Sequence, residues 1–229
     1  MTAEQSGRPR IRDAGRAKVI LELFTRNVAR SGYAGSNFSE IAGELGISKG
    51  TIVHHYGTKD QLFAQMHDSY MERRLAEAEA IVAKLETPEK QLAGLLFAFL
   101  QYQDIDRYAT VALQREIATL STHEAMAHGR RRRADYLAVV RGVIAEGVRK
   151  NDFRALDVDL QSLLIFGASQ WAWTWFEPGH RLTAMESGSQ LVQLALGALL
   201  VDRRPLERLA DPQGEVAATV VSLLPRADG

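Results

Sequence analysis

The chain has 229 residues, of which 46% are hydrophobic and 24% charged, a globular composition that excludes a disordered protein. The absence of cysteine excludes disulfides, thiolate metal sites and thiol catalysis, and it fits a reducing cytoplasm. The 28 basic residues balance the 28 acidic ones, which argues against a uniformly basic nucleic-acid binder. Residues 1–60 nevertheless hold nine Lys and Arg against six acids, a local excess of +3 that favours contact with an anion.

The N-terminal segment is polar, contains several arginines and is not followed by an apolar stretch. A signal peptide or a membrane-spanning helix needs such a stretch, so neither is predicted. We therefore expect a cytoplasmic protein without membrane contact, and a disordered basic arm over residues 1–11.

From residue 12 onwards the apolar residues recur with the helical period, and no run alternates with period two for long enough to form a strand. The predicted fold class is therefore all-α. A first helix is indicated by Ile20, Phe24 and Val28, which share one face. It should end near Ser31-Gly32, where glycine supplies a left-handed cap residue.

Two short helices follow, and each has a recognisable start. Asn37 is a capping residue for a helix over residues 38–45, which Gly46 ends. Ser48 is placed to cap the next helix, which should run to about Tyr56.

The remainder of the chain is also predicted to be helical. Thr58 with Gln61 forms the capping box of a long fourth helix, and Thr87-Pro88 combines a cap with a first-turn proline. From residue 59 onwards, helices are predicted over residues 59–84, 88–102, 104–119, 123–149, 157–176 and 183–202, with a weaker one over 214–224.

The two short helices, joined by the tight turn Gly46-Ile47, have the pattern of a helix-turn-helix, whose second helix enters the major groove of DNA. Their apolar residues are spaced to pack against Phe24, which leaves the outer face of the second helix for DNA. Free amides at helix N-termini provide further seats for phosphate. We predict DNA contacts at Ser36, Asn37, Ser48, Lys49, Gly50, Thr51, His54, His55 and Lys59.

Three of these residues have a second interpretation. One of the adjacent histidines, His54 or His55, could be an ordinary surface residue while the other supports Tyr56, which we expect in the core. Lys59 could be a solvated charge on the fourth helix instead of a phosphate ligand.

Residues 38–63, "FSEIAGELGISKGTIVHHYGTKDQLF", closely resemble the signature of the TetR family, and the resemblance extends upstream to about residue 12. It implies a DNA-binding domain over residues 12–58 and a helical effector-binding and dimerisation domain over 59–225. It also implies a homodimeric repressor that binds a near-palindromic double-stranded operator and is released by a small effector. One position departs from the family pattern, because Val53 stands where a DNA-contacting tyrosine is usual, which places the sequence preference in doubt.

Candidate effector-binding residues lie on three of the later helices. Phe99 continues an apolar stripe, and Arg133 is in phase with another, so a partly inward guanidinium could clamp a phosphate or carboxylate. A solvated surface is the alternative for this arginine. We predict that the pocket is lined by Phe99, Tyr102, Arg133, Trp171 and Trp175.

The predicted helix over residues 157–176 is apolar on nearly every side, so it needs two packing partners. One partner is its own domain, and we assign the other face to a second subunit. The predicted dimer-interface residues are Phe166, Trp173 and Phe176, although the tryptophans could belong to the core alone.

Residues 167–183, "GASQWAWTWFEPGHRLT", resemble a segment of TetR-type regulators of fatty-acid, phenylacetate and sterol-fragment breakdown, whose effectors are coenzyme A thioesters. This implies an acyl-CoA effector. A different hydrophobic or aromatic effector, and an activator or architectural protein without an effector, remain alternatives. We find no nucleophile–base pair, phosphate-cradling loop or metal-ligand spacing, so no catalytic residue, metal, cofactor or enzymatic activity is predicted.

Overall fold

The computed structural model describes residues 8–120 and 124–224. Within these ranges the chain is helical and forms no sheet, which confirms the predicted all-α class. An isolated antiparallel bridge between Phe153 and Leu200 is the single β-type pairing of the described residues.

The helices and their bounds are α1 (Arg8–Gly35), α2 (Phe38–Leu45), α3 (Lys49–Tyr56), α4 (Lys59–Lys84), α5 (Pro88–Ile105), α6 (Arg107–Leu120), η1 (Glu124–Met126), α7 (Ala127–Arg149), α8 (Val158–Gln170), η2 (Trp171–Thr174), α9 (Ala184–Leu199), α10 (Leu206–Leu209) and α11 (Glu215–Leu223). The η elements are single 3₁₀ turns.

The predicted end of regular helix near Gly32 and the predicted bounds of α2, α3 and α4 are confirmed. The regular geometry of α1 breaks at Gly32, whose φ is 78°. Gly46 ends α2 in the left-handed region at φ 62°, where a side chain at this position would be strained. Thr58 and Gln61 exchange both hydrogen bonds of the capping box, at 3.2 Å and 2.8 Å.

Helices α5, α6, α7 and α9 differ from their predicted bounds by a few residues, and two further boundaries also differ. Residues 8–11, assigned to a disordered arm, form the first turn of α1, and residues 1–7 lie outside the described part of the chain. The predicted helix over 157–176 stops at Gln170 and tightens into η2, where the Thr174 hydroxyl donates to the Trp171 carbonyl at 2.8 Å. Threonine offers the backbone this local alternative to the regular helix. The short helix α10 was not predicted.

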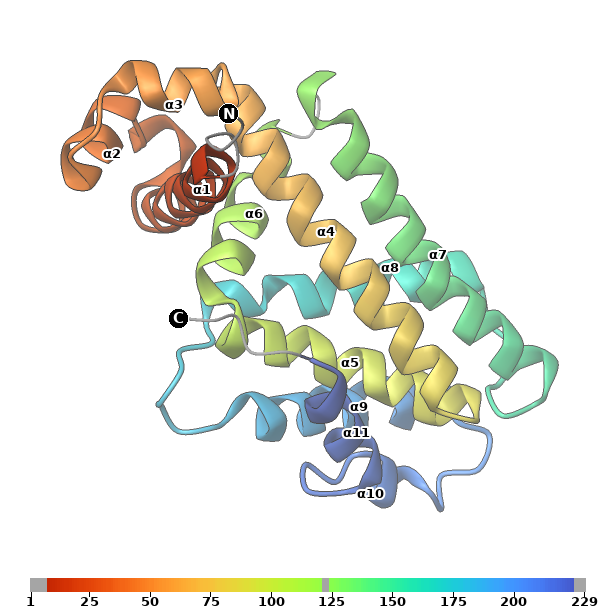
Figure 1. The fold of residues 1–229 in the computed structure, drawn as a ribbon. Coiled ribbons are helices and arrows are strands. Elements are labelled where there is room, and N and C mark those ends of the chain that lie inside the picture. Colours follow the sequence, from red (N-terminus) through yellow and green to blue (C-terminus); the bar gives the residue numbers. More distant parts are fainter. Residues whose placement is uncertain (1–7, 121–123, 225–229) are drawn as a thin grey trace, which may run out of the picture.

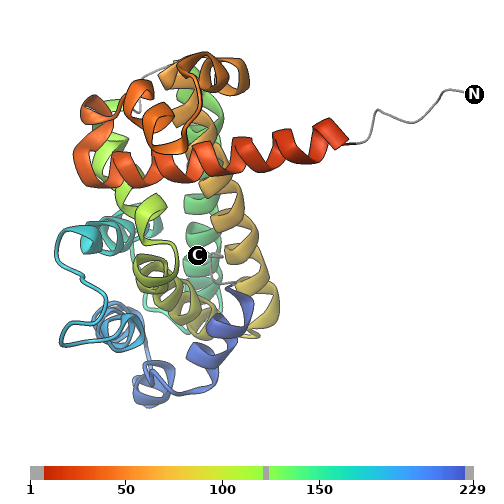
Figure 2. The ribbon, with the colours of Figure 1, turned by 60° about the vertical axis from the view of Figure 1, so that its left-hand side comes forward.

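The elements form a small N-terminal group and a larger helical body (Figure 1). Helices α1, α2 and α3 make up the small group, and α4 runs from it along the body beside α7. Helix α5 lies at the centre, where every residue from Leu92 to Leu100 is buried. A view turned by 60° shows the N-terminal turns of α1 extending beyond the rest of the molecule (Figure 2).

Close packing of α4 against α7 depends on a glycine. A β-carbon added to Gly129 of α7 would lie 1.8 Å from Nδ1 of His67 on α4, far inside van der Waals contact. The imidazole therefore occupies the space that a side chain on α7 would need.

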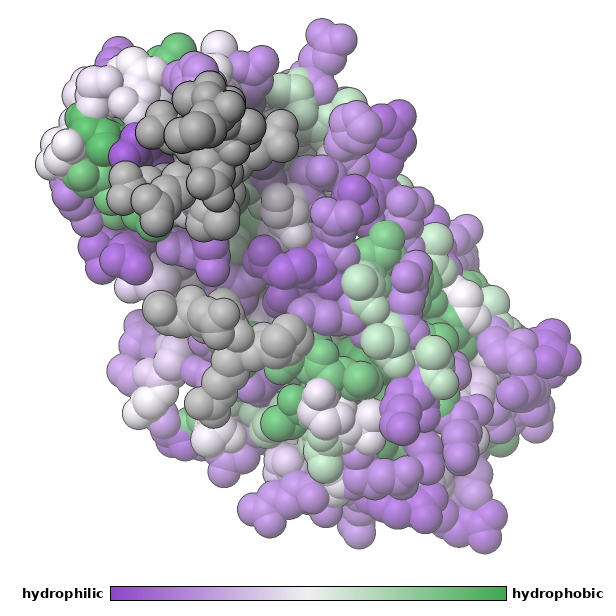
Figure 3. Space-filling view, viewed as in Figure 1, coloured by the Kyte–Doolittle hydropathy of each residue, from purple (hydrophilic) through white to green (hydrophobic). Residues whose placement is uncertain are grey.

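Figure 3 shows hydrophilic side chains over much of α7 and a hydrophobic area where α4 meets the C-terminal helix α11. Val216, Ala217 and Val220 of α11 are buried against α4 and α5. No helix within residues 8–120 and 124–224 is long and apolar enough to cross a membrane.

Candidate functional site

The helix-turn-helix is held by side-chain caps at both helix starts. The Asn37 side chain accepts a hydrogen bond from the Glu40 amide at 2.9 Å, and the Ser48 hydroxyl accepts one from the Thr51 amide at 3.1 Å. These bonds satisfy amides that the start of a helix leaves without partners. The residues at the start of α3, from Ser48 to Gly50, are exposed.

Helix α3 has one buried and one exposed face. Ile52 and Tyr56 pack into the core, and the Tyr56 hydroxyl donates to the Ala17 carbonyl at 2.6 Å, which confirms the prediction that Tyr56 is a core residue. The His54 ring lies edge-on to the His55 ring, with centroids 5.6 Å apart. The exposed or half-exposed residues at the start and on the outer face of α3 are Ser48, Lys49, Gly50, Thr51, Val53, His54 and His55.

The predicted DNA contact of Ser36 is corrected by the structure. This residue is only 1% exposed, and its hydroxyl donates to the Gly32 carbonyl at 3.0 Å. The side chain closes the end of α1 and does not reach the outer face. Asn37, its neighbour, is exposed, and its contact with DNA stays a prediction.

Lys59 has an intramolecular role that the sequence did not indicate. Its ammonium group donates to the carbonyls of Tyr33 and Ser36, both at 2.8 Å, and lies 4.2 Å from the centre of the Tyr33 ring. The Tyr33 hydroxyl donates to Asp60, and burial together with this carboxylate raises the pKa of Tyr33. The start of α4 is thereby tied to the end of α1, with one N–H of Lys59 left for a further acceptor.

A cavity lies inside the helical body, with an empty volume of about 470 Å³ including its open mouth. It is lined by His67, Tyr70, Met71, Arg74, Phe99, Tyr102, Leu113, Gln114, Ile117, Arg133, Tyr136, Phe166 and Gln170.

Three of the five residues predicted for the pocket line this cavity, namely Phe99, Tyr102 and Arg133. The other two are corrected, because Trp171 is 64% exposed, Trp175 is 56% exposed and neither lines the cavity.

The structure also changes the assignment of the residues predicted at the dimer interface. Phe166 is 6% exposed and lines the cavity, where its ring packs edge-on against Phe99 with centroids 5.5 Å apart. Phe176 is 3% exposed, so both phenylalanines belong to the core of their own chain. Trp173 is partly buried, and its position leaves the interface prediction open.

Arg133 projects inward at the mouth of the cavity. Its guanidinium donates to the Gln170 side chain at 3.0 Å and lies 5.5 Å from the centre of the Phe166 ring. Burial lowers the pKa of Arg133. It makes no ion pair with an acid among the described residues, unlike Arg132, which pairs with Asp68 at 2.7 Å. A partly desolvated cation of this kind favours an anion in the cavity mouth.

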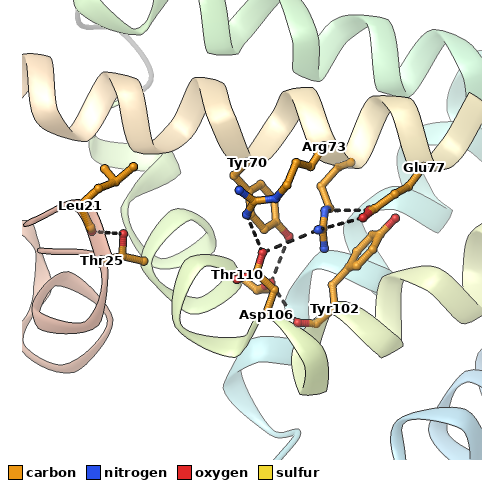
Figure 4. A network of polar contacts seen from close by, with 9 residues as sticks. Leu21, Thr25, Tyr70, Arg73, Glu77, Tyr102, Asp106 and Thr110 are labelled. Carbon is orange, nitrogen blue, oxygen red and sulfur yellow. Dashed lines mark hydrogen bonds and ion pairs between the residues drawn. The ribbon is translucent and has the colours of Figure 1, made fainter. Parts of the chain in front are cut away.

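The inner end of the cavity is lined by a buried polar network (Figure 4). Arg74 is 4% exposed and pairs with Glu77 at 3.0 Å and with Asp106 at 3.6 Å. Its guanidinium also lies 4.0 Å from the centre of the Tyr102 ring. The hydroxyl groups of Tyr70 and Thr110, the latter on α6, form a hydrogen bond of 3.1 Å. The network therefore joins α4 to α5 and α6.

His67 is the most buried titratable residue on the cavity wall, at 1% exposure. Burial, reinforced by the positive charge of Arg133, lowers the pKa of His67 to about 4. The imidazole is therefore neutral near pH 7, and neither ring nitrogen has a hydrogen-bond partner among the described residues.

Helix α6 contacts both the cavity and the N-terminal group. Leu113, Gln114 and Ile117 face the cavity. Residues of the same turn that do not line the cavity bind α1, because Glu116 accepts from the Tyr33 amide at 3.0 Å and Arg115 donates to the Arg30 carbonyl at 3.3 Å. A shift of α6 would therefore also move the end of α1, and α1 is the helix that supports the helix-turn-helix.

Several large apolar side chains remain on the surface of α8, η2 and α9. They are Leu160, Leu163, Leu164, Trp171, Trp175 and Leu194, which are between 51% and 70% exposed. A monomer seldom exposes this many large apolar side chains within one stretch of its chain.

Among residues 8–120 and 124–224, no group of three or more His, Cys, Asp or Glu side chains is placed to hold a metal ion.

Two family models match the chain. Residues 20–66 match the model described as bacterial regulatory proteins of the tetR family, and residues 85–199 match the tetracyclin repressor-like C-terminal domain. The second match alone spans half of the chain. It also contains most of the cavity-lining residues.

Similar proteins are found in sequence and in structure. The transcriptional repressor KstR2 of Mycobacterium tuberculosis is 25% identical over 181 residues, which cover 79% of this chain and 90% of KstR2. The solved structure of this ketosteroid transcriptional regulator superposes with a TM-score of 0.76, over 82% of this chain and 96% of that chain.

A second solved structure is that of AibR in complex with isovaleryl coenzyme A and operator DNA, at a TM-score of 0.71 and 23% identity. It covers 78% of this chain and 97% of AibR, and it shows the same fold. Taken with the two family models, these likenesses establish that the chain belongs to the TetR family of transcriptional regulators, which bind DNA through a helix-turn-helix and are not enzymes.

Proposed function

We propose that this chain is a homodimeric repressor that leaves its operator when an acyl-CoA thioester enters the cavity. The observation that carries the proposal is Arg133 at the cavity mouth, whose guanidinium donates to Gln170 but forms no ion pair with an acid among the described residues. An acyl group fits the aromatic wall formed by Phe99 and Phe166, while the anionic coenzyme A part remains outside beside the arginine. The relative AibR, whose structure contains isovaleryl coenzyme A, supports this class of effector.

The proposed DNA contacts come from the exposed face of α3 and from the start of α4. Lys49, Thr51 and His54 are placed to reach base edges or phosphates in the major groove. The free amides at the start of α3 add phosphate contacts. Val53 is 46% exposed on the same helix, so the contact of the usual tyrosine is replaced here by a short apolar side chain.

The proposed dimer forms through α8, η2 and α9. Leu164 and Leu194, at 57% and 70% exposure, are the most exposed leucines on these helices, and the two exposed tryptophans lie between them in the chain. A two-fold axis through this surface would bury these side chains and present two α3 helices to successive major grooves. The operator would accordingly be near-palindromic, with half-sites one helical turn apart or a multiple of it.

The proposed release mechanism uses α6 as the link between cavity and DNA-binding group. A ligand against Leu113 and Ile117 displaces α6, and the bonds of Glu116 and Arg115 carry this displacement to the end of α1. Release follows only if the thioester has higher affinity for the displaced arrangement than for the DNA-bound one.

The test is a titration of the protein bound to a labelled operator, first obtained by selection from random duplexes. Several acyl-CoA thioesters and the matching free acids are added to wild type and to Arg133→Met. We expect release by the thioesters and a weaker response of the variant. Arg131→Met is the matched control, because Arg131 is exposed on the same helix and does not line the cavity.

The outcome also separates the alternative effectors. Release by an uncharged aromatic compound but by no thioester would contradict the acyl-CoA effector and leave a repressor with another hydrophobic ligand. A protein that binds its operator with the same affinity in the presence of every compound would be a regulator without an effector.

A further inference from the structure

The inner end of the cavity is polar, which a plain hydrocarbon chain would not require. Tyr102 and Tyr136 are each 2% exposed, and neither hydroxyl makes a hydrogen bond of normal geometry to a described residue. The two hydroxyls are near neighbours, and Tyr102 also approaches the Glu77 carboxylate. Nη1 of Arg74 and both ring nitrogens of His67 are likewise buried without a partner.

Burial of donors without acceptors costs free energy, because each group loses its hydrogen bonds to water and gains none in the protein. A simple fatty acyl chain in this cavity would leave these groups unsatisfied and would also exclude water from them. A ligand oxygen placed between Tyr102 and Tyr136 would instead receive one or both hydroxyl hydrogens. The unpartnered donors therefore indicate that the ligand carries a hydrogen-bond acceptor at this end of the cavity.

The charges at this end decide which kind of oxygen is favoured. Glu77 and Asp106 already compensate Arg74, at 3.0 Å and 3.6 Å. A ligand carboxylate beside Tyr102 would meet the negative charge of Glu77 at close range in a medium of low dielectric constant. Burial raises the pKa of both tyrosines, so their hydroxyls stay protonated and able to donate. An uncharged acceptor is the better match.

We infer that the effector carries an uncharged oxygen, a ketone or a hydroxyl, on the part of its acyl group that reaches Tyr102 and Tyr136. This rests on the proposed acyl-CoA effector and narrows it to oxygenated acyl groups. The two ends of the cavity then have separate tasks, because Arg133 at the mouth binds the anionic part and the tyrosine pair recognises the oxygen.

The difference in burial shows which end of the cavity is the mouth. The residues at the inner end are fully buried, whereas those at the mouth are half-buried, namely Gln114, Ile117, Arg133 and Gln170. An aromatic wall lies between the ends, where the Phe99 and Tyr136 ring centroids are 5.4 Å apart. A flat ring packs on such a wall better than a flexible chain, because less conformational freedom is lost.

The experiment compares two thioesters that differ by a single oxygen, cyclohexanecarboxyl-CoA and 4-oxocyclohexanecarboxyl-CoA. Each is titrated calorimetrically into the full-length protein without DNA. We expect the oxo compound to bind about tenfold more tightly, because one buried donor pair gains its acceptor. In Tyr136→Phe the ratio of the two dissociation constants should approach one, and Tyr102→Phe should lower it as well.

The two dissociation constants are compared within each variant. A general loss of folding affects both constants alike and therefore cancels in their ratio. Tyr108→Phe is the matched control, because Tyr108 is exposed on α6, does not line the cavity and keeps its ring beside Arg26 and Arg30. This variant should retain the wild-type ratio.

The same two compounds are then added to the operator complex, which separates the two proposals. Equal binding of both thioesters, with release of DNA, would overturn the oxygen inference and leave the proposed function intact. Preferential binding of the oxo compound without release would sustain the inference and contradict the proposed function. Failure of both thioesters to bind would overturn the two together.

Discussion

Replacement of Arg74 by methionine tests the buried network beside the cavity. Arg74 is 4% exposed and Glu77 is 8% exposed, so their ion pair is shielded from water. Arg74→Met keeps most of the side-chain volume but leaves the Glu77 carboxylate buried without its partner. Loss of one member of a buried pair costs about 3–5 kcal/mol. For a chain of this size that lowers Tm by roughly 6–20 °C.

The matched control is Arg73→Met, one position earlier on α4. Arg73 pairs with Asp106 at 2.8 Å, but its side chain is 51% exposed, so the solvent screens the interaction. We expect a loss of less than about 1 kcal/mol. The double variant Arg74→Met/Glu77→Leu removes both buried charges and should be more stable than Arg74→Met alone.

The pH dependence of the single variant gives a second test. Burial already raises the pKa of Glu77, and Arg74 opposes that rise, so the pKa climbs further in Arg74→Met. An acid with a raised pKa in the folded state contributes stability below its unfolded pKa and loses it as the pH rises through the folded one. The deficit of Arg74→Met should therefore be larger at pH 8 than at pH 5.

Urea denaturation followed by circular dichroism, at one fixed protein concentration and at both pH values, measures these free energies of unfolding. The reasoning is refuted if Arg74→Met unfolds within about 1 kcal/mol of wild type. It is also refuted if the double variant is no more stable than the single one.

Three further outcomes are predicted. Lys59→Ala should weaken binding to all DNA sequences equally and reduce the salt slope by about 1, measured by fluorescence anisotropy at several salt concentrations; an unchanged slope would reject the phosphate contact. Trp171→Glu should shift the chain towards monomer in analytical ultracentrifugation, since this side chain is 64% exposed, and an unaltered dimer would place the interface elsewhere. Gly129→Ala should destabilise the fold by about 1–3 kcal/mol in thermal unfolding, because the new β-carbon would lie 1.8 Å from the His67 ring; a gain in stability would contradict this packing.

Local signals made most of the fold predictable. Gly46 and the Thr58 capping box act through their own backbone and the next few residues, so their effects can be read from sequence alone. The end of α8 at Gln170 could not be found in this way. Its apolar pattern continues through residues 171–176, where Thr174 is the single polar residue, and the change to a 3₁₀ turn depends on bonds such as that of Thr174.

The candidate site was predictable where a polar residue interrupted an apolar stripe, as with Arg133. Periodicity could not assign the faces of α8 and η2, because apolar residues occur on every side. As a result, Phe166, which was predicted at the dimer interface, lines the cavity. Trp171, which was predicted to line the cavity, is exposed.

The polar side chains at the inner end were missed for a different reason. Arg74 and Glu77 stand three residues apart on a long helix, which is the usual spacing of a solvated surface pair. Their burial depends on α5 and α6, which cover them only in the folded chain. The burial of His67 could not be predicted either, because it depends on the packing of Gly129 of α7 against this side chain.

Reciprocal coupling between operator and thioester tests the central proposal most directly. If a thioester in the cavity lowers operator affinity by a given factor, bound operator must lower thioester affinity by the same factor. Calorimetric titration of the thioester into free protein and into the protein–operator complex measures that factor, and we predict a ratio of roughly 5–150, matched by the loss of operator affinity at saturating thioester. Equal thioester affinity for free and operator-bound protein would contradict effector-controlled release.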